Sequence, residues 1–175
     1  MTAVQVERLE FTFTASAAPF QYERAGQNVH GWPRGVQVVD VVAHDVGETD
    51  EIVWLIEAKD YRKITKPPQP SKLAKLAETV KQKVEGTLAS LPVVAETSHD
   101  DDARAHATKS RGVARRRVVL HLEPYPPGGP HDALFRGLEG SVLQKLRQIL
   151  RDIDRDPLVL NIDRTPRARV PWTVR

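Results

Sequence analysis

The chain has 175 residues, of which 40% are hydrophobic and 28% are charged, which fits one domain (residues 1–175) with a buried core and argues against a wholly disordered chain. The formal net charge is +3, a mild basic excess that is far from a histone-like tail. The sequence contains no cysteine, which excludes disulfide scaffolds, thiol nucleophiles and cysteine-ligated zinc or iron–sulfur sites.

The first third of the chain shows mainly strand patterns. Residues 4–14 alternate between apolar and polar side chains, which predicts one strand. The following segment contains a proline and two glycines, and we expect only a short helix near residues 20–25. Residues 35–45 and 51–60 are rich in β-branched side chains and are separated by a short loop, which predicts a β-hairpin.

A helix is expected after this hairpin. Ser71 can cap its N-terminus, and apolar residues recur at spacings of three and four as far as Leu91. Pro92 is expected to end the helix. The polar segment 96–117 includes His99 followed by three aspartates, and we interpret it as a flexible surface loop.

The last third of the chain is predicted to alternate between strand and helix. We expect a buried strand at residues 118–122, an amphipathic helix at 141–153, a final strand at 158–162 and a basic C-terminal tail at 164–175. Together with the hairpin, this order predicts an α/β fold. It is a three-layer sandwich with a mixed central sheet, in which a β-hairpin is followed by α-β-α-β.

The hairpin brings three charged residues to one face of the expected sheet. A symmetrical four-residue loop places Val46 opposite Glu51, and the same register places Asp40 directly opposite Glu57. Opposed residues of an antiparallel pair point to the same face, with Cβ atoms about 5 Å apart. Lys59 lies two residues beyond Glu57 and therefore shares this face.

Two opposed carboxylates in a partly dry place repel each other unless a positive charge lies between them. Lys59 supplies one charge, and a divalent cation would satisfy both carboxylates better. Mg²⁺ typically binds through one or two carboxylates and a substrate phosphate, and a bound ion lowers the pKa of its water. The hairpin therefore has the parts required for phosphodiester hydrolysis; the alternative is a structural ion cluster without a metal.

Asp40 followed by Glu57-Ala58-Lys59 resembles the Asp…(Asp/Glu)-x-Lys signature of PD-(D/E)xK nucleases, which include restriction enzymes, junction resolvases and repair nucleases. In that family a hairpin bears the motif within an αβββαβ core, and the element order of residues 35–162 is similar. The resemblance implies a restriction-endonuclease-like fold. It also implies that Asp40, Glu57 and the Ala58 carbonyl ligate Mg²⁺ or Mn²⁺, and that Lys59 serves the attacking water.

The sequence departs from the family pattern before the hairpin. Val39 stands where many members have proline. The family usually carries an acidic residue on a preceding helix, and Glu23 is the candidate by position, with an ordinary surface residue as the alternative. Gln82 or Lys83 could occupy the polar position that some members have on the following helix.

Basic residues after the motif are candidates for phosphate contacts. Arg62, Lys63 and Lys66 could follow a nucleic-acid backbone, and a solvated loop is the alternative. In the C-terminal tail, Trp172 could stack on a nucleic-acid strand, but packing of the tail onto the body is the interpretation we favour.

These patterns predict a metal-dependent nuclease, with DNA as the expected partner. The alternative is a catalytically inactive nuclease-like module that binds nucleic acid or a protein. Small nucleases of this type often act as dimers, so a homodimer stays open beside a monomer. The N-terminus has no signal-peptide pattern and no apolar run is long enough to span a bilayer, so we expect a cytoplasmic protein without a membrane partner.

Overall fold

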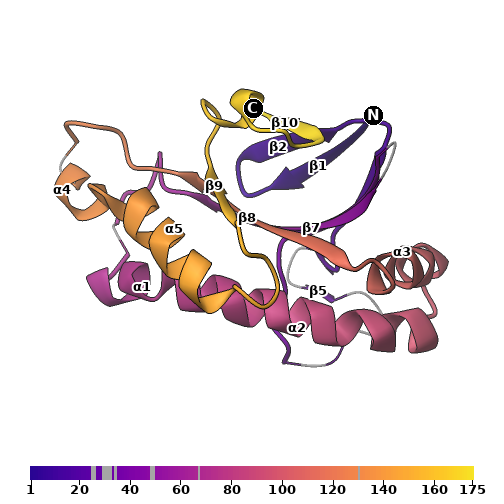
Figure 1. Cartoon of the computed structure of the whole chain (residues 1–175). Coiled ribbons are helices and arrows are strands. Elements are labelled where there is room, and N and C mark those ends of the chain that lie inside the picture. The colour runs from indigo at the N-terminus through magenta and orange to yellow at the C-terminus, as the bar shows by residue number, and fades with distance from the viewer. Residues whose placement is uncertain (25–26, 29–32, 34, 48–49, 67, 130) are drawn as a thin grey trace.

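The computed structural model describes the chain except for residues 25–26, 29–32, 34, 48–49, 67 and 130. The described residues form a mixed five-stranded sheet, a three-stranded antiparallel sheet and several helices, which confirms the expected α/β class (Figure 1). None of the described helices is long and apolar enough to cross a membrane.

The five-stranded sheet has the order β3-β6-β7-β8-β9. Its strands are β3 (Ala17–Phe20), β6 (Val41–Val46), β7 (Glu51–Asp60), β8 (Arg115–Glu123) and β9 (Leu158–Leu160). The first three are antiparallel neighbours, whereas β8 runs parallel to both β7 and β9. The prediction of a mixed sheet built on a hairpin is therefore confirmed.

The hairpin has the predicted register. Val46 pairs with Glu51 and Val41 pairs with Ile56, and the Gly47 amide donates to the Asp50 carbonyl at 2.9 Å across the loop. Strand β6 begins only at Val41, one residue after Asp40. Period-two patterning and a short loop were sufficient to predict this register, because both act between residues that are close in sequence.

The N-terminal segment is a hairpin rather than the single strand expected at residues 4–14. Strand β1 (Thr2–Val6) pairs with β2 (Leu9–Phe13), and Glu7 turns the chain with a φ of 52°. This left-handed conformation is uncommon for glutamate, and the sequence has no glycine here that would predict a turn. The only sequence sign of the turn is that the apolar alternation shifts by one residue between Val6 and Leu9.

The basic C-terminal tail completes this second sheet. Strand β10 (Trp172–Val174) pairs with β2, and a short 3-10 helix η1 (Thr165–Arg167) precedes it. Trp172 is buried against Phe13 and Trp54, with ring centroids 5.6 and 5.2 Å apart respectively. The expectation that this tryptophan packs the tail onto the body is confirmed.

A very short strand, β4 (Glu23–Arg24), lies where a short helix was expected. It pairs with a second short strand, β5 (Gln27–Asn28). Phe20 belongs to β3 and pairs with Val42, so the chain enters this segment extended. Within the described residues 20–24 the expectation of a helix is wrong, because pairing along the sheet edge overrides a weak local preference. Residue 25 lies outside the described residues.

Five α-helices complete the described part of the chain: α1 (Pro70–Ala74), α2 (Leu76–Thr97), α3 (Asp101–Arg111), α4 (Asp132–Phe135) and α5 (Leu138–Ile149). The expected capping by Ser71 is wrong, because α1 begins at Pro70 with Gln69 at the cap position and no side-chain cap. Helix α2 continues past Pro92, which was expected to end it. Pro92 is exposed while Leu91 and Val94 are buried, so packing of the inner face holds the helix together.

Helix α3 occupies a segment that was interpreted as a flexible loop, residues 96–117. The Asp100 side chain accepts a hydrogen bond from the Ala103 amide at 3.0 Å and caps the helix. Its buried face is made of small and polar residues, including Ala103, His106 and Ala107. The large aliphatic residues that normally reveal an amphipathic helix are missing from this face, so the pattern does not stand out in the sequence.

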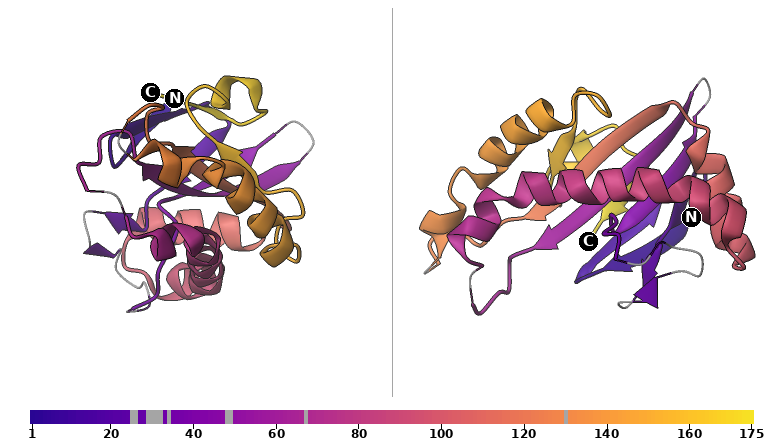
Figure 2. Two further views of the ribbon diagram at one scale, coloured as in Figure 1. Left: turned by 90° about the vertical axis from the view of Figure 1, so that its left-hand side faces the viewer. Right: turned by 90° about the horizontal axis from the view of Figure 1, so that it is seen from below.

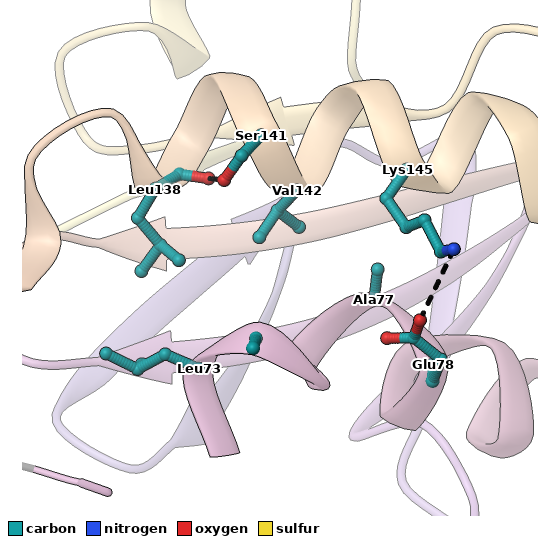
Figure 3. Close-up of a pocket in the computed structure, with 8 residues that line it drawn as sticks. Leu73, Ala77, Glu78, Leu138, Ser141, Val142 and Lys145 are labelled. Carbon is teal, nitrogen blue, oxygen red and sulfur yellow. Dashed lines mark hydrogen bonds and ion pairs between the residues drawn. The ribbon is translucent and has the colours of Figure 1, made fainter. Parts of the chain in front are cut away.

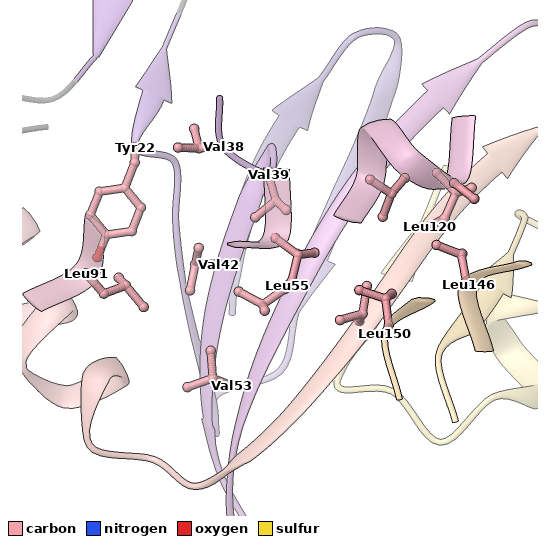
Figure 4. Packing of buried hydrophobic residues seen from close by; sticks show 14 of the residues in the cluster. Tyr22, Val38, Val39, Val42, Val53, Leu55, Leu91, Leu120, Leu146 and Leu150 are labelled. Atoms are coloured by element: carbon pink, nitrogen blue, oxygen red, sulfur yellow. The ribbon is translucent and has the colours of Figure 1, made fainter. Parts of the chain in front are cut away.

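The two faces of the five-stranded sheet are covered differently (Figures 1 and 2). On one face Val42, Leu55 and Leu120 pack against α2 and α5, and Figure 4 shows this cluster. On the other face Trp54 and Ile56 pack against the sheet of β1, β2 and β10. The layers are therefore helices, a five-stranded sheet and a three-stranded sheet, and Glu57, which Lys83 of α2 contacts, lies on the helical side.

Candidate functional site

Asp40 lies where the chain enters β6, and its side chain is tied to the neighbouring strand. The Ala58 amide donates to Asp40 Oδ2 at 2.8 Å. On the other side, Thr87 in α2 accepts from the Val39 amide at 3.0 Å and donates to the Lys83 carbonyl at 2.7 Å. Helix α2 therefore sets the position of Asp40 relative to β7.

Glu57 is the most deeply buried of the charged residues here, with 1% of its surface exposed. Lys83 of α2 donates to both of its carboxylate oxygens, at 2.8 and 2.9 Å. Lys59 lies 2.8 Å from Glu57 Oε1, and Lys83 also reaches within 3.9 Å of Asp40 Oδ1. Asp40, Glu57, Lys59 and Lys83 form what we call the carboxylate–lysine cluster. The structure thus brings Asp40, Glu57 and Lys59 together as predicted.

Lys83 was one of two residues considered for a polar position on this helix. The structure distinguishes them, because Lys83 points at Glu57 while Gln82 is exposed. Glu7 was missed by sequence reasoning. It accepts from the Asp60 amide at 2.8 Å and lies 3.8 Å from Lys59, at the turn of the β1–β2 hairpin. No local signal could have found it, because Glu7 and Asp60 are 53 residues apart in the sequence.

The electrostatics of the cluster follow from its burial. Burial, and after it the Asp40 carboxylate, raise the pKa of Glu57 above its ordinary value, although the two lysines act in the opposite direction. Burial by itself would lower the pKa of Lys59, but the carboxylates of Glu57 and Asp40 raise it above its ordinary value. Lys59 is therefore protonated near neutral pH, and it can donate a hydrogen bond but cannot take a proton from water.

The oxygen donors of Asp40 and Glu57 are of the kind that Mg²⁺ prefers. However, both Glu57 oxygens accept from Lys83, whose ammonium lies close to both carboxylates. Among the residues that the structure describes, no group of three or more His, Cys, Asp or Glu side chains could hold a metal ion. These residues therefore fit a divalent ion only when the Lys83 ammonium gives way to it.

The other predicted site residues lie on two further segments of the chain, strand β4 and the loop after β7. Glu23 lies on strand β4 rather than on a helix, and its side chain is outside the described part of the structure. Arg62 forms a two-point pair with Asp60, with nitrogen–oxygen distances of 2.9 and 2.8 Å. Lys63 and Lys66 are exposed on the loop that follows β7. Arg62 is thus occupied within the chain, whereas these two lysines face solvent.

A cleft of about 660 Å³ opens beside the cluster, and we call it the lysine cleft. It is lined by Gln37, Lys59, Tyr61, Pro68, Gln69, Ser71, Lys72, Lys75, Leu76 and Thr79. Lys59 belongs to both the cleft and the cluster, so the two are adjacent. Among the residues that the structure describes, the lining includes three lysines and no carboxylate, which makes the cleft a concave positive surface.

A second hollow, of about 370 Å³, lies between α1, α2 and α5 (Figure 3). Leu73, Leu138 and Val142 give it an apolar lining, and an ion pair between Lys145 and Glu78 at 3.6 Å lies on one side. None of the cluster residues lines it. This hollow therefore has neither paired carboxylates nor a concentration of positive charge.

No family model, curated protein or solved structure matches this chain.

Proposed function

We propose that this protein is a metal-dependent nuclease of the PD-(D/E)xK type that cleaves DNA. The observation that carries the proposal is the approach of Asp40 and Glu57, whose carboxylates both lie near Lys83, next to a cleft with three lysines. Paired carboxylates suit a divalent cation, and a positive cleft suits a phosphate chain. Together they match the chemistry of phosphodiester hydrolysis better than that of any other reaction that these side chains support.

The topology adds support for a restriction-endonuclease-like fold. From β3 onward the order is three antiparallel strands, helices and a parallel strand, as in the βββαβ part of that core. The first helix of the core has no counterpart among the described residues before β3, where β1 and β2 lie instead. The proposed fold therefore differs from the family pattern at its N-terminal end.

Each cluster residue has a proposed role. Asp40, Glu57 and the Ala58 carbonyl would hold Mg²⁺ or Mn²⁺, which when bound supplies positive charge at the phosphate and a water of lowered pKa. Lys59, protonated, would orient that water and offset negative charge on the phosphate. Lys83 would hold Glu57 and Asp40 in place until the ion enters. Glu23 stays a prediction as a further acidic residue.

Cleavage assays on duplex DNA, single-stranded DNA and RNA, with Mg²⁺, Mn²⁺ or EDTA, test the proposal. We expect Asp40→Asn and Glu57→Gln to lower a metal-dependent cleavage rate by about 100-fold or more. Asp50→Asn is the matched control, because Asp50 lies at the loop end of the same hairpin and pairs with Arg115. Cleavage that persists in EDTA, or that Asp40→Asn leaves unchanged, would contradict the assignment.

One observation favours a second function, that of a nuclease-like module that binds without cleaving. Lys83 satisfies both Glu57 oxygens, so the cluster is already neutralised without a metal. For such a module we expect binding of nucleic acid in EDTA that Asp40→Asn does not weaken, together with no turnover on any substrate. Metal-dependent turnover that needs Asp40 would exclude this alternative.

A further inference from the structure

We infer that the lysine cleft binds the phosphate of a nucleotide unit, and that Lys72 and Lys75 are its main contacts. The inference deepens the proposed function, on which it rests for the identity of the ligand as nucleic acid. The cleft would hold the nucleic-acid strand beside the cluster, and apart from Lys59 its lining lies outside the motif.

The charges of the cleft are the first argument. Lys72 and Lys75 are exposed, and within the described part of the chain neither forms an ion pair. The charge of Lys59 is partly neutralised by its ion pair with Glu57, whereas no such pair neutralises Lys72 or Lys75 among the described residues. Positive charges gathered in a concave surface raise the local potential, which attracts an anion of matching size.

The remaining lining suits a nucleotide better than a bare anion. Ser71, Gln37 and Gln69 bring hydrogen-bonding groups to the cleft, while Tyr61, Pro68 and Leu76 bring apolar surface. The volume of about 660 Å³ lies within the range of sites that enclose small organic ligands. Lysines beside an aromatic ring are the combination that binds phosphate and base together in single-stranded nucleic acids.

The position of the cleft is the third argument. Lys59 lines the cleft and also touches Glu57, so a phosphate held by Lys72 and Lys75 lies on the approach to the cluster. Both lysines come from the junction of α1 and α2, where the chain breaks its helical path at Lys75. A nucleic-acid strand bound by these lysines would therefore be held in a fixed position relative to the carboxylates of the cluster. Such positioning of the substrate is what a cleavage site requires.

The test measures binding in EDTA, so that it does not depend on cleavage. Fluorescence anisotropy of a labelled single-stranded oligonucleotide is compared for wild type, Lys72→Gln/Lys75→Gln and Lys109→Gln/Arg155→Gln. The last variant is the matched control, because it removes the same charge from two exposed side chains that do not line the cleft. We expect the cleft variant to lose about tenfold in affinity, and the control less than about twofold.

The dependence on salt gives a second readout. Removing two phosphate contacts lowers the slope of log Kd against log salt by about 1.4 for a single strand. We expect this drop in the cleft variant and not in the control. Equal losses in both variants would mean that general charge alone attracts the strand, and this result would overturn the inference. Absence of binding to wild type would overturn it as well.

Competition identifies the source of the phosphate. A nucleoside monophosphate that displaces the oligonucleotide from wild type, and binds more weakly to Lys72→Gln/Lys75→Gln, would identify a free nucleotide as sufficient. Displacement only by unlabelled oligonucleotide would identify a strand. The proposed function is judged separately, because a wild type that binds through the cleft but never cleaves would contradict the nuclease and leave the cleft intact.

Discussion

Glu57 shows how a single residue constrains the candidate site. Its carboxylate is almost fully buried and receives hydrogen bonds from Lys83 and an ion pair from Lys59. Removing one partner of a buried pair is costly, because the charge that is left has neither water nor a counter-ion. The cluster is therefore both a candidate catalytic centre and a source of structural constraint, and substitutions separate the two roles.

We expect Lys83→Met to lower the free energy of unfolding by about 2 kcal/mol near neutral pH. The loss is smaller than for a buried carboxylate without any partner, because Lys59 still pairs with Glu57. Urea denaturation measures this change. Lys81→Met is the control on the same helix, since Lys81 pairs with Glu85 at the surface at 3.5 Å and should cost less than about 0.5 kcal/mol. Equal costs for both variants would show that Lys83 does not hold the cluster together.

At the scale of elements, the contact between α2 and the segment that leads into β6 determines where Asp40 lies. Gly86 makes this contact close, because a Cβ atom at that position would lie 2.3 Å from the Gln37 carbonyl oxygen and 2.8 Å from Val36. The Thr87 hydroxyl then bonds the Val39 amide. Gly86 and Thr87, at consecutive positions of α2, thus bring the helix and the segment before β6 to hydrogen-bonding distance.

Gly86→Ala should push α2 away from this segment and lower the free energy of unfolding by about 2 kcal/mol. The Ala58 amide, which donates to Asp40, should shift in an NMR spectrum because its acceptor moves. Gly140→Ala is the matched control in helix α5, where an added Cβ meets nothing within 4 Å. It should raise stability by about 0.5–1 kcal/mol. An unperturbed Ala58 amide in Gly86→Ala would argue against positioning of Asp40 by α2.

At the scale of the whole molecule, buried polar groups join parts that are distant in sequence. His106 of α3 bonds the Tyr22 hydroxyl at 2.8 Å and the Ala18 carbonyl at 3.0 Å, across separations of 84 and 88 residues. Burial lowers the pKa of His106 from 6.5 to about 4, although the hydrogen bond to the Ala18 carbonyl acts in the opposite direction; His44 and Lys109 make smaller contributions that also lower it. The attachment of α3 to β3 therefore depends on a neutral imidazole.

This attachment makes stability sensitive to acid. Because the folded-state pKa lies below the unfolded value of 6.5, the unfolded chain takes up the proton first, and stability is lost as the pH falls from about 6.5 to about 4. We expect wild type to lose about 2 kcal/mol more than His106→Gln between about pH 7 and about pH 5. Urea unfolding at both pH values measures it. Parallel losses in the two proteins would show that His106 is not responsible.

The parts that sequence reasoning predicted are those in which the deciding contacts are local. The register of β6 and β7 follows from alternation and a short loop, and it correctly brought Asp40 close to Glu57 and Lys59. Strands β8 and β9 and helix α5 were found because each carries a run of large apolar residues. In all of these, neighbours along the chain carry the information.

The tertiary structure alone decided the rest. Helix α3 forms where alanines and a histidine find a surface to pack on, and α2 passes Pro92 because its buried face holds it. Lys83 and Glu7 reach the cluster from separate elements. Such contacts depend on the relative placement of distant segments, which no local pattern encodes. The sequence by itself therefore determined the paired carboxylates, and tertiary packing decided the lysines and the cleft that surround them.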